Sequence, residues 1–201
     1  MAYQSIKRLV DFVVSFIGLI LLSPLFLIIA GLIKLQDGGP VFYVAERVGI
    51  RGKRFRFPKF RTMLLDADAK RSELKSRQIH SGNRTLKVKE DPRVTALGRF
   101  LRRTSIDELP QLWCVFKGDM SLVRPRPALP EEVDEYSSSE RKRLDVLPGI
   151  TCLWQVSGRS DLPFARQLEL DLEYIHKRNL WLDLKILLKT IPAVISGKGA
   201  Y

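Results

Sequence analysis

The residues RRTSIDELPQL, at positions 102–112, place two adjacent carboxylates, Asp107 and Glu108, inside a strongly basic sequence. The 201-residue chain has a formal net charge of +12, so an acidic pair next to arginines needs a physical reason. One reason is structural. Ser105 and Glu108 fit the capping box Ser-x-x-Glu at the start of a helix running to Phe116, and Asp107 would complement the helix dipole.

The same carboxylates suit a catalytic role. A carboxylate at a helix N-terminus near Arg102 is expected to keep a low pKa and stay ionised, and an ionised aspartate can attack phosphorus. A divalent cation held by Asp107 and Glu108 would offset the repulsion between carboxylate and substrate phosphates. Arg102 adds forked donors for phosphate oxygens. We therefore hypothesise a nucleophile at Asp107, with the capping box as its structural alternative.

The basic excess predicts an anionic partner, which is nucleic acid, a phospholipid headgroup or a phosphorylated substrate. The only cysteines, Cys114 and Cys152, belong to no Cys-x-x-Cys or Cys/His cluster, which argues against a zinc site. A basic chain without a signal peptide is expected to face a reducing cytoplasm, so both thiols are expected to be free.

An apolar run at positions 10–33 is long enough to span a bilayer, and it is too long for a signal peptide. Ser23-Pro24 lies in its middle and predicts a kink or a break in the helix. Either the kinked helix crosses the membrane, or it turns back at Pro24 and re-enters on the same face. Basic residues on both sides of the run favour two cytoplasmic ends, but prolines also occur in ordinary spanning helices.

Two strands with a Gly49-x-x-Gly52 turn between them predict a β-hairpin over positions 41–57. Arginine and phenylalanine alternate over positions 54–57, so they are expected on opposite faces, and we expect the pattern to continue through Lys59-Phe60-Arg61. The basic face is either solvated and attractive to anionic lipid, or it binds phosphate with Lys59 and Arg61 facing an active site.

Two further clusters carry candidate binding residues. Arg126 lies between two prolines, whose rigid backbone suits a side chain that holds phosphate, although such arginines also occur in ordinary loops. The run from position 148 to 159 contains Trp154, Gln155 and Arg159. It would suit a nucleotide base and phosphate, but a buried strand with a core tryptophan explains the same residues equally well.

The remaining segments predict further helices. We expect an exposed helix over positions 66–77, a surface histidine at His80, a helix start at Asp91 and a helix from Phe164 to Lys177. A later apolar stretch, kinked or ended by Pro192, is either core or an amphipathic helix in the membrane interface, and the interface is favoured. Asp171 is expected to pair with a basic group near the N-terminal segment.

Together these motifs resemble the monotopic phosphoglycosyl transferases, the bacterial sugar transferase family. The C-terminal run that ends at positions 196–201 resembles the members that initiate exopolysaccharide synthesis. The resemblance runs nearly end to end, in the family's order. It rests on Ser23-Pro24, Lys59–Met63, Arg102, Ser105–Gln111, Gly118–Ser121, Pro125–Pro127, Pro148–Thr151 and Gln155–Arg159.

The resemblance implies an α+β, mostly helical monotopic membrane protein with a re-entrant helix (1–36) broken at Ser23-Pro24 and a cytoplasmic-face catalytic domain (37–201) with a β-hairpin and interfacial helices. It implies transfer of sugar-1-phosphate from a UDP-sugar, glucose or galactose, to undecaprenyl phosphate, releasing UMP. Asp107 would form the covalent intermediate, Glu108 would help bind Mg²⁺, and the protein would lie in the bacterial inner membrane among phospholipids. The substrate-binding residues would be Lys59, Arg61, Arg102, Arg126, Gln155 and Arg159.

Two positions depart from the family pattern, because Arg124 and Cys152 stand where the family usually or often has glycine. A cysteine at a position that needs positive φ would be strained. The alternative function is a non-enzymatic, membrane-anchored module that binds anionic lipid or nucleic acid. It does not explain the carboxylate pair, so no nucleic-acid partner is expected, while a homodimer is compatible with the sequence.

Overall fold

The computed structural model describes residues 2–67, 91–197 and 199. Within them the chain is mostly helical, with two small two-stranded sheets, in agreement with the α+β class expected from the sequence. Most of the helix expected over positions 66–77, and His80, fall outside the described residues.

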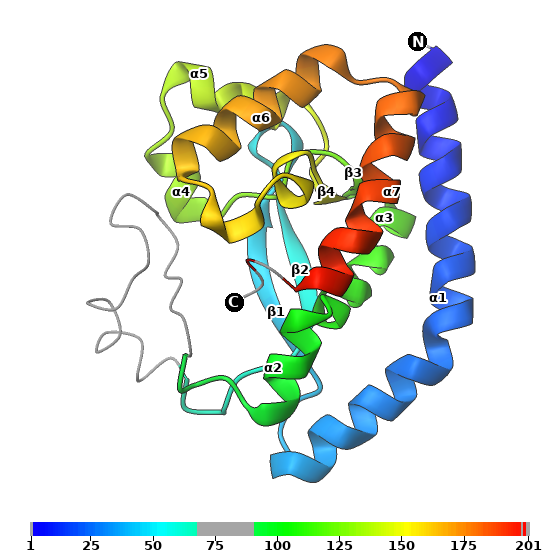
Figure 1. The fold of residues 1–201 in the computed structure, drawn as a ribbon, viewed down its shortest axis with the longest axis vertical. Helices are drawn as coiled ribbons and strands as arrows, with labels where there is room; N and C mark the ends of the chain where they lie inside the picture. The colour runs from blue at the N-terminus through cyan, green and yellow to red at the C-terminus, as the bar shows by residue number, and fades with distance from the viewer. Residues whose placement is uncertain (1, 68–90, 198, 200–201) are drawn as a thin grey trace.

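The long helix α1 (Ala2–Asp37) carries the apolar N-terminal run. Within the described residues it is the one helix that is long and apolar enough to cross a membrane. The helix continues through Pro24, and Figure 1 shows a bend between its dark blue first half and its lighter second half, so of the two expected outcomes the kink forms and the break does not. A bend is what proline causes when it removes one backbone hydrogen bond and crowds the preceding turn.

The first turns of α1 are docked on the rest of the chain. Arg8 donates hydrogen bonds to the carbonyl oxygens of Val115 and Phe116, at 2.6 and 2.8 Å, near the end of α3 (Leu112–Lys117). These carbonyls belong to the last turn of a helix, where the backbone lacks helical partners. Phe12 stacks on Phe116 with ring centroids 5.0 Å apart, which adds apolar contact to the polar one.

The second half of α1 also contacts the folded unit. Ile29 and Ile33 form a buried cluster with Phe60 and Leu101. At the end of the helix, both carboxylate oxygens of Asp37 accept hydrogen bonds from the guanidinium of Arg61. Both ends of α1 therefore lie against the same body of structure (Figure 1).

The predicted hairpin forms from β1 (Phe42–Val48) and β2 (Arg54–Phe60), which pair antiparallel without a bulge. Arg54 and Arg56 are exposed and Phe57 is fully buried, as the alternation predicts. The pattern does not continue unchanged past Pro58, because two non-basic residues stand between Arg56 and Lys59. Lys59 consequently shares a face with Phe57, and its Nζ lies 5.5 Å from the centre of that ring. Because of this change in the pattern, the Lys59 side chain lies on the inner face of the hairpin.

A second, parallel pair of strands, β3 (Ser121–Val123) and β4 (Gly149–Thr151), lies in the main core. Position 149 requires glycine, because a Cβ there would lie 2.2 Å from the backbone nitrogen of Arg124. The core around these strands combines residues from the hairpin, α3, α6 (Phe164–Lys177) and α7 (Leu180–Ser196), namely Phe57, Val115, Met120, Val123, Tyr174 and Ile186.

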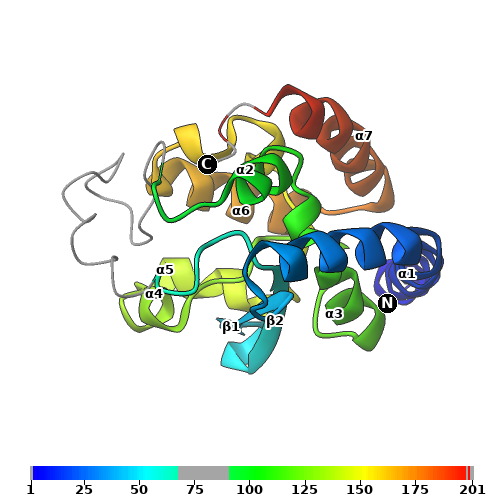
Figure 2. The ribbon, with the colours of Figure 1, turned by 90° about the horizontal axis from the view of Figure 1, so that it is seen from below.

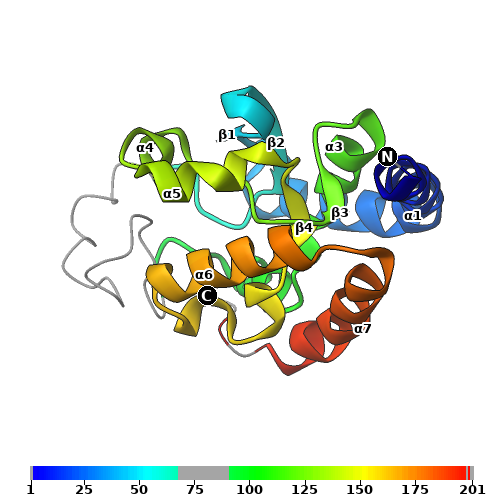
Figure 3. The same ribbon diagram turned by 90° about the horizontal axis from the view of Figure 1, so that it is seen from above.

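The apolar helices gather on one side of the molecule. Figures 2 and 3 show α1, α3 and α7 together, away from α4 (Pro130–Asp134) and α5 (Ser138–Arg141). Helix α7 contains Pro192 and continues past it to Ser196. It exposes a stripe of large apolar side chains at helical spacing, formed by Trp181, Leu184, Leu188, Ile191 and Ile195.

The expected helix start at Asp91 is wrong. Helix α2 (Ala96–Arg103) begins after Thr95, whose hydroxyl accepts a hydrogen bond from the backbone nitrogen of Gly98 at 2.9 Å. The Asp91 carboxylate instead accepts hydrogen bonds from the backbone and side chain of Arg93. The Asp91 carboxylate, which would have capped the helix, is therefore already paired with Arg93.

The expected partner of Asp171 is also wrong. Its carboxylate forms an ion pair with Arg143 at 2.7 Å, not with a basic group of the N-terminal segment. Arg143 lies in the short 3-10 helix η4 (Lys142–Asp145) and also donates to the hydroxyl of Tyr136 at 2.7 Å. Both members of the pair are buried, so they hold η4 against α6.

Candidate active site

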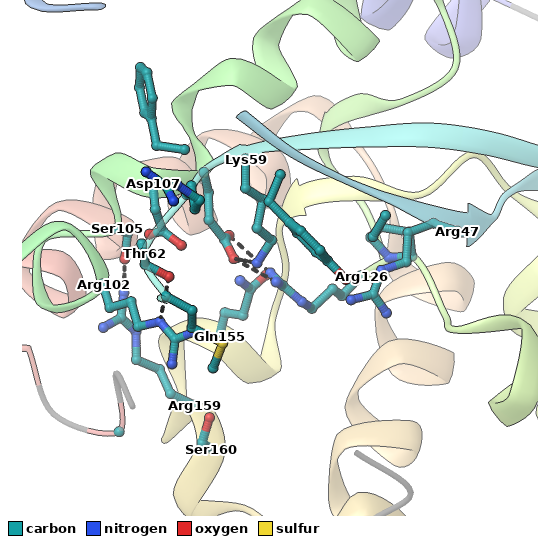
Figure 4. Close-up of a pocket in the computed structure, with 18 of the residues that line it drawn as sticks. Arg47, Lys59, Thr62, Arg102, Ser105, Asp107, Arg126, Gln155, Arg159 and Ser160 are labelled. Atoms are coloured by element: carbon teal, nitrogen blue, oxygen red, sulfur yellow. Dashed lines mark hydrogen bonds and ion pairs between the residues drawn. The ribbon is translucent and has the colours of Figure 1, made fainter. Parts of the chain in front are cut away.

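A cavity of about 550 Å³ lies between the inner face of the hairpin, α2, and the loops that follow β3 and β4 (Figure 4). All eight site residues proposed from the sequence line it, although they come from five separate segments. They are Lys59, Arg61, Arg102, Asp107, Glu108, Arg126, Gln155 and Arg159.

The carboxylate pair lies on the 3-10 helix η3 (Ile106–Gln111), which joins α2 to α3. The predicted capping box does not form. Ser105 has left-handed backbone angles, φ 55° and ψ 17°, and its side chain caps no helix. Its hydroxyl instead accepts a hydrogen bond from Nη2 of Arg159 at 2.9 Å. The Glu108 carboxylate takes no part in a capping box either, because it binds basic side chains from other segments.

Glu108 is held by two cations. Its Oε1 accepts a hydrogen bond from Nζ of Lys59 at 2.9 Å, and Arg126 donates to both carboxylate oxygens, at 2.5 and 3.0 Å. Burial alone would raise the pKa of Glu108, but Arg126 and Lys59 outweigh it and hold the pKa well below its usual range. Glu108 is therefore the fixed negative charge of the site.

Asp107 differs from its neighbour. Its side chain is buried, and none of the described residues forms a hydrogen bond or ion pair with its carboxylate (Figure 4). Burial raises the pKa of Asp107 to about 6, with a further contribution from the negative charge of Glu108, against the opposing effect of Lys59, Arg102 and Arg126. The low pKa expected from the sequence is therefore wrong, because burial outweighs the stabilising effect of the nearby cations.

The other basic residues take different positions around the cavity. Nε of Arg102 donates to the hydroxyl of Thr62 at 3.0 Å, and Arg61 is committed to Asp37 at the end of α1. Nη1 of Arg159 is buried and has no hydrogen-bond partner. Gln155 accepts a hydrogen bond from the Cys152 thiol at 3.1 Å.

Several polar residues that line the cavity were not proposed as site residues from the sequence, among them Arg47, Thr62, Ser105 and Arg143. Arg47 was predictable, because it lies opposite Phe55 in the hairpin register and so shares the inner face with Lys59. Arg143 had no sequence signal, since its burial depends on Asp171 and Tyr136 from other segments.

The cavity is electropositive. Its lining contains seven lysine or arginine side chains and three aspartate or glutamate side chains. Its arginines are buried or half-buried, and burial lowers the pKa of Arg102 and of Arg47 because it disfavours the charged form. Closely spaced, partly desolvated guanidinium groups bind an anion with several oxygens, such as a diphosphate.

A magnesium ion is compatible with the carboxylate pair. Mg²⁺ is commonly held by one or two carboxylates and completes its shell with water and substrate phosphates. The carboxylate of Asp107 is bound by no described residue, and Glu108 lies next to it in the sequence. Within the described residues no group of three or more His, Cys, Asp or Glu side chains could hold a metal, so an ion here would depend on the phosphates of a substrate.

The two departures from the family pattern lie outside the reacting centre. The Arg124 guanidinium lies 5.7 Å from the ring centre of Tyr3 on α1, and Arg124 does not line the cavity. Cys152 is buried without positive φ, so its backbone carries no strain of the left-handed kind. Both cysteines are free, as expected.

Comparison with known proteins places the chain in a family. A model of the bacterial sugar transferases matches residues 2–197. The chain is 43% identical over 198 residues to the exopolysaccharide production protein ExoY of Sinorhizobium fredii, covering 97% of this chain and 88% of that protein.

Two longer relatives are named as phosphotransferases. The chain is 42% identical to the undecaprenyl-phosphate galactose phosphotransferase of Salmonella typhimurium and 39% identical to the undecaprenyl-phosphate glucose phosphotransferase of Komagataeibacter xylinus. These alignments cover 98% and 97% of this chain but only 42% and 37% of the relatives. Since the family model matches almost its whole length, the chain belongs to the bacterial sugar transferase family.

Proposed function

We propose that this protein transfers sugar-1-phosphate from a UDP-sugar to undecaprenyl phosphate and releases UMP, with Asp107 as the covalent nucleophile. The observation that carries the proposal is the buried Asp107 carboxylate, which no described residue binds, inside a basic cavity of about 550 Å³. A carboxylate that the fold buries without a donor is available for a reacting partner.

The reaction proceeds in two displacements. An ionised oxygen of Asp107 attacks the phosphorus that bears the sugar, an Asp–O–P bond forms, and the bond to the UMP oxygen breaks. A phosphate oxygen of undecaprenyl phosphate then attacks the same phosphorus and releases Asp107 as a carboxylate. Splitting one difficult exchange between two anions into two steps is the usual advantage of nucleophilic catalysis.

The surrounding residues bind charge and fix geometry. Arg102, Arg126 and Arg159 border the cavity and offer donors to the diphosphate of the donor substrate. Lys59 and Arg126 keep Glu108 in one position. Magnesium, when bound by Asp107 and Glu108 with the substrate phosphates, would neutralise part of the phosphate charge.

The placement of α1 supports a re-entrant membrane segment. A helix of 36 residues is about 54 Å long at 1.5 Å per residue, longer than a bilayer core is thick. Its first turns contact α3 and its last residue contacts Arg61, so both ends lie against one domain. A domain occupies one side of a membrane, which favours a segment that enters and leaves by the cytoplasmic face of the inner membrane. The exposed stripe on α7 would then lie in the interface.

The names of the relatives guide the choice of substrates. Since they are named for undecaprenyl phosphate, galactose and glucose, we propose UDP-galactose or UDP-glucose as donor and undecaprenyl phosphate as acceptor. The non-enzymatic alternative is not retained, because the family is one of transferases.

The test is UMP release in detergent or nanodiscs with magnesium, using a panel of UDP-sugars, with and without undecaprenyl phosphate. The wild-type protein should release one equivalent of UMP without acceptor, and Asp107→Asn should release none. Asp119→Asn is a matched control, because Asp119 pairs with Lys117 outside the cavity. Undiminished UMP release by Asp107→Asn would disprove the nucleophile.

A further inference from the structure

Ser105 has a backbone conformation that serine rarely adopts. Within the described residues only three non-glycine residues have positive φ, namely Arg51, Ser105 and Arg159. Arg51 lies in the hairpin turn, remote from the cavity. Ser105 and Arg159 are joined by the 2.9 Å hydrogen bond from the guanidinium to the hydroxyl. Two unfavourable conformations are therefore linked by one contact.

The position of Ser105 shows why this matters. Helix α2 ends at Arg103, Thr104 is its C-cap, and Ser105 occupies the following site, where helices commonly have glycine because the left-handed angles strain a Cβ. The chain turns there into η3, and Asp107 follows two residues later. The backbone angles of Ser105 therefore set the direction in which η3 presents the carboxylate.

Arg159 connects this turn to the cavity. Nη2 is used by Ser105, whereas Nη1 is buried without a hydrogen-bond partner in the wall of the cavity. A buried, unpaired guanidinium nitrogen is costly unless an acceptor occupies its position. The acceptor that fits is an anionic oxygen, such as one of the donor diphosphate.

We propose that Ser105 is a positioning residue, whose hydroxyl and the Arg159 guanidinium form a latch that fixes the left-handed turn and, through it, the direction of Asp107. The inference rests on the proposed function. The Arg159 nitrogen that binds Ser105 and the nitrogen that meets phosphate belong to one rigid plane, so donor binding and nucleophile placement are coupled.

The test separates backbone strain from the hydrogen bond with three substitutions. Ser105→Gly relieves the strain but removes the acceptor, so the Tm should stay equal or rise while UMP release at saturating UDP-sugar falls about 10- to 100-fold. Ser105→Asn tolerates left-handed angles and offers an acceptor oxygen, so its rate should recover to within about fivefold of wild type. Ser105→Ala keeps the strain without the bond and should lose both rate and Tm.

Arg51→Gly is the matched control, since it relieves the same kind of strain away from the cavity. It should leave UMP release unchanged. The KM for UDP-sugar should change less than the rate in Ser105→Gly, because Arg159 keeps its charge. In a double-mutant cycle, Ser105→Gly and Arg159→Met should be non-additive.

The outcomes distinguish this inference from the proposed function. Wild-type rates in Ser105→Gly, or a raised KM with an unchanged rate, would overturn the latch while an inactive Asp107→Asn still supports the nucleophile. An active Asp107→Asn would overturn the proposed function whatever the Ser105 variants do.

Discussion

The charges that dock α1 are buried and the charges that line the cavity are buried or half-buried, and the two sets are paired to different degrees. In the first cluster, the Lys7 ammonium contacts Asp11 at 2.7 Å and Asp183 at 3.5 Å. Asp11 also accepts hydrogen bonds from the Ser121 hydroxyl and from the Leu122 backbone nitrogen. We call this set, with Asp183 and its two tyrosine donors, the docking cluster.

Asp183 completes the docking cluster. Its two carboxylate oxygens accept hydrogen bonds from the hydroxyls of Tyr3 and Tyr174, at 3.1 and 2.6 Å. Each charged group in the cluster therefore has partners from α1, β3, α6 or α7. In the cavity, by contrast, Glu108 is doubly paired while Asp107 has no bond from any described residue.

The contrast teaches how to separate a structural cluster from a catalytic one. A fully satisfied buried network holds elements in place, and losing one partner leaves a buried charge uncompensated. A buried carboxylate without a donor costs stability and is kept where function requires it. Variants in the docking cluster should therefore lose stability, whereas variants of Asp107 should lose activity and gain stability.

The largest expected effect is on the docking cluster. Asp183→Ala leaves Lys7 and two tyrosine hydroxyls with fewer partners in a buried site, and it should destabilise the protein by about 3–5 kcal/mol. The measurement is the thermal unfolding midpoint in nanodiscs. UMP release per folded molecule should remain near wild type, since Asp183 does not line the cavity. A variant with wild-type Tm would show that the cluster does not hold α1.

The next effect has the opposite sign. Asp107→Asn should stabilise the protein at pH 8 by at most about 3 kcal/mol, because the fold raises the pKa of this carboxyl from 3.8 to about 6. The folded state thus favours the protonated form. The stability contributed by protonated Asp107 is complete below pH 3.8 and is lost as the pH rises through about 6.

The difference in Tm between Asp107→Asn and wild type should therefore be greatest above pH 7 and shrink to nothing below pH 4. Asp119→Asn, which lies just after α3 and outside the cavity, should show no such dependence. Equal Tm values at pH 8 would mean that the carboxyl carries no burial penalty, and the contrast with the docking cluster would disappear.

The same pKa predicts the pH dependence of activity. The nucleophile must be ionised, so kcat/KM for UMP release should fall about tenfold per pH unit as the pH drops below about 6. This loss corresponds to about 1.4 kcal/mol per unit. A rate profile on the free enzyme, recorded with the Asp119→Asn control, measures it. A profile that stays flat down to pH 4.5 would exclude a raised pKa at Asp107.

The chemistry of the site was more predictable from sequence than its local geometry. The alternation of Arg54–Phe57 gave the hairpin and its buried face, because strand periodicity is a local property. The capping box failed because Glu108 is drawn to Lys59 and Arg126, which are 49 and 18 residues away. Local patterns do not report such distant competitors, and they also concealed the burial that raises the pKa of Asp107.

The smallest expected effect concerns Arg124, the residue that departs from the family pattern. Its side chain is buried and its guanidinium lies 5.7 Å from the ring of Tyr3, so Arg124→Ala should cost about 0.5–2 kcal/mol of stability.

Tyr3→Leu should remove the same contact, whereas Tyr3→Phe keeps the ring and loses only the bond to Asp183. If the ring is the partner of Arg124, Arg124→Ala should be non-additive with Tyr3→Leu and additive with Tyr3→Phe in unfolding measurements. UMP release should not change, because Arg124 contacts the ring of Tyr3 on α1 and does not line the cavity. A loss of UMP release at unchanged Tm would instead show that Arg124 acts in catalysis rather than in holding α1 through Tyr3.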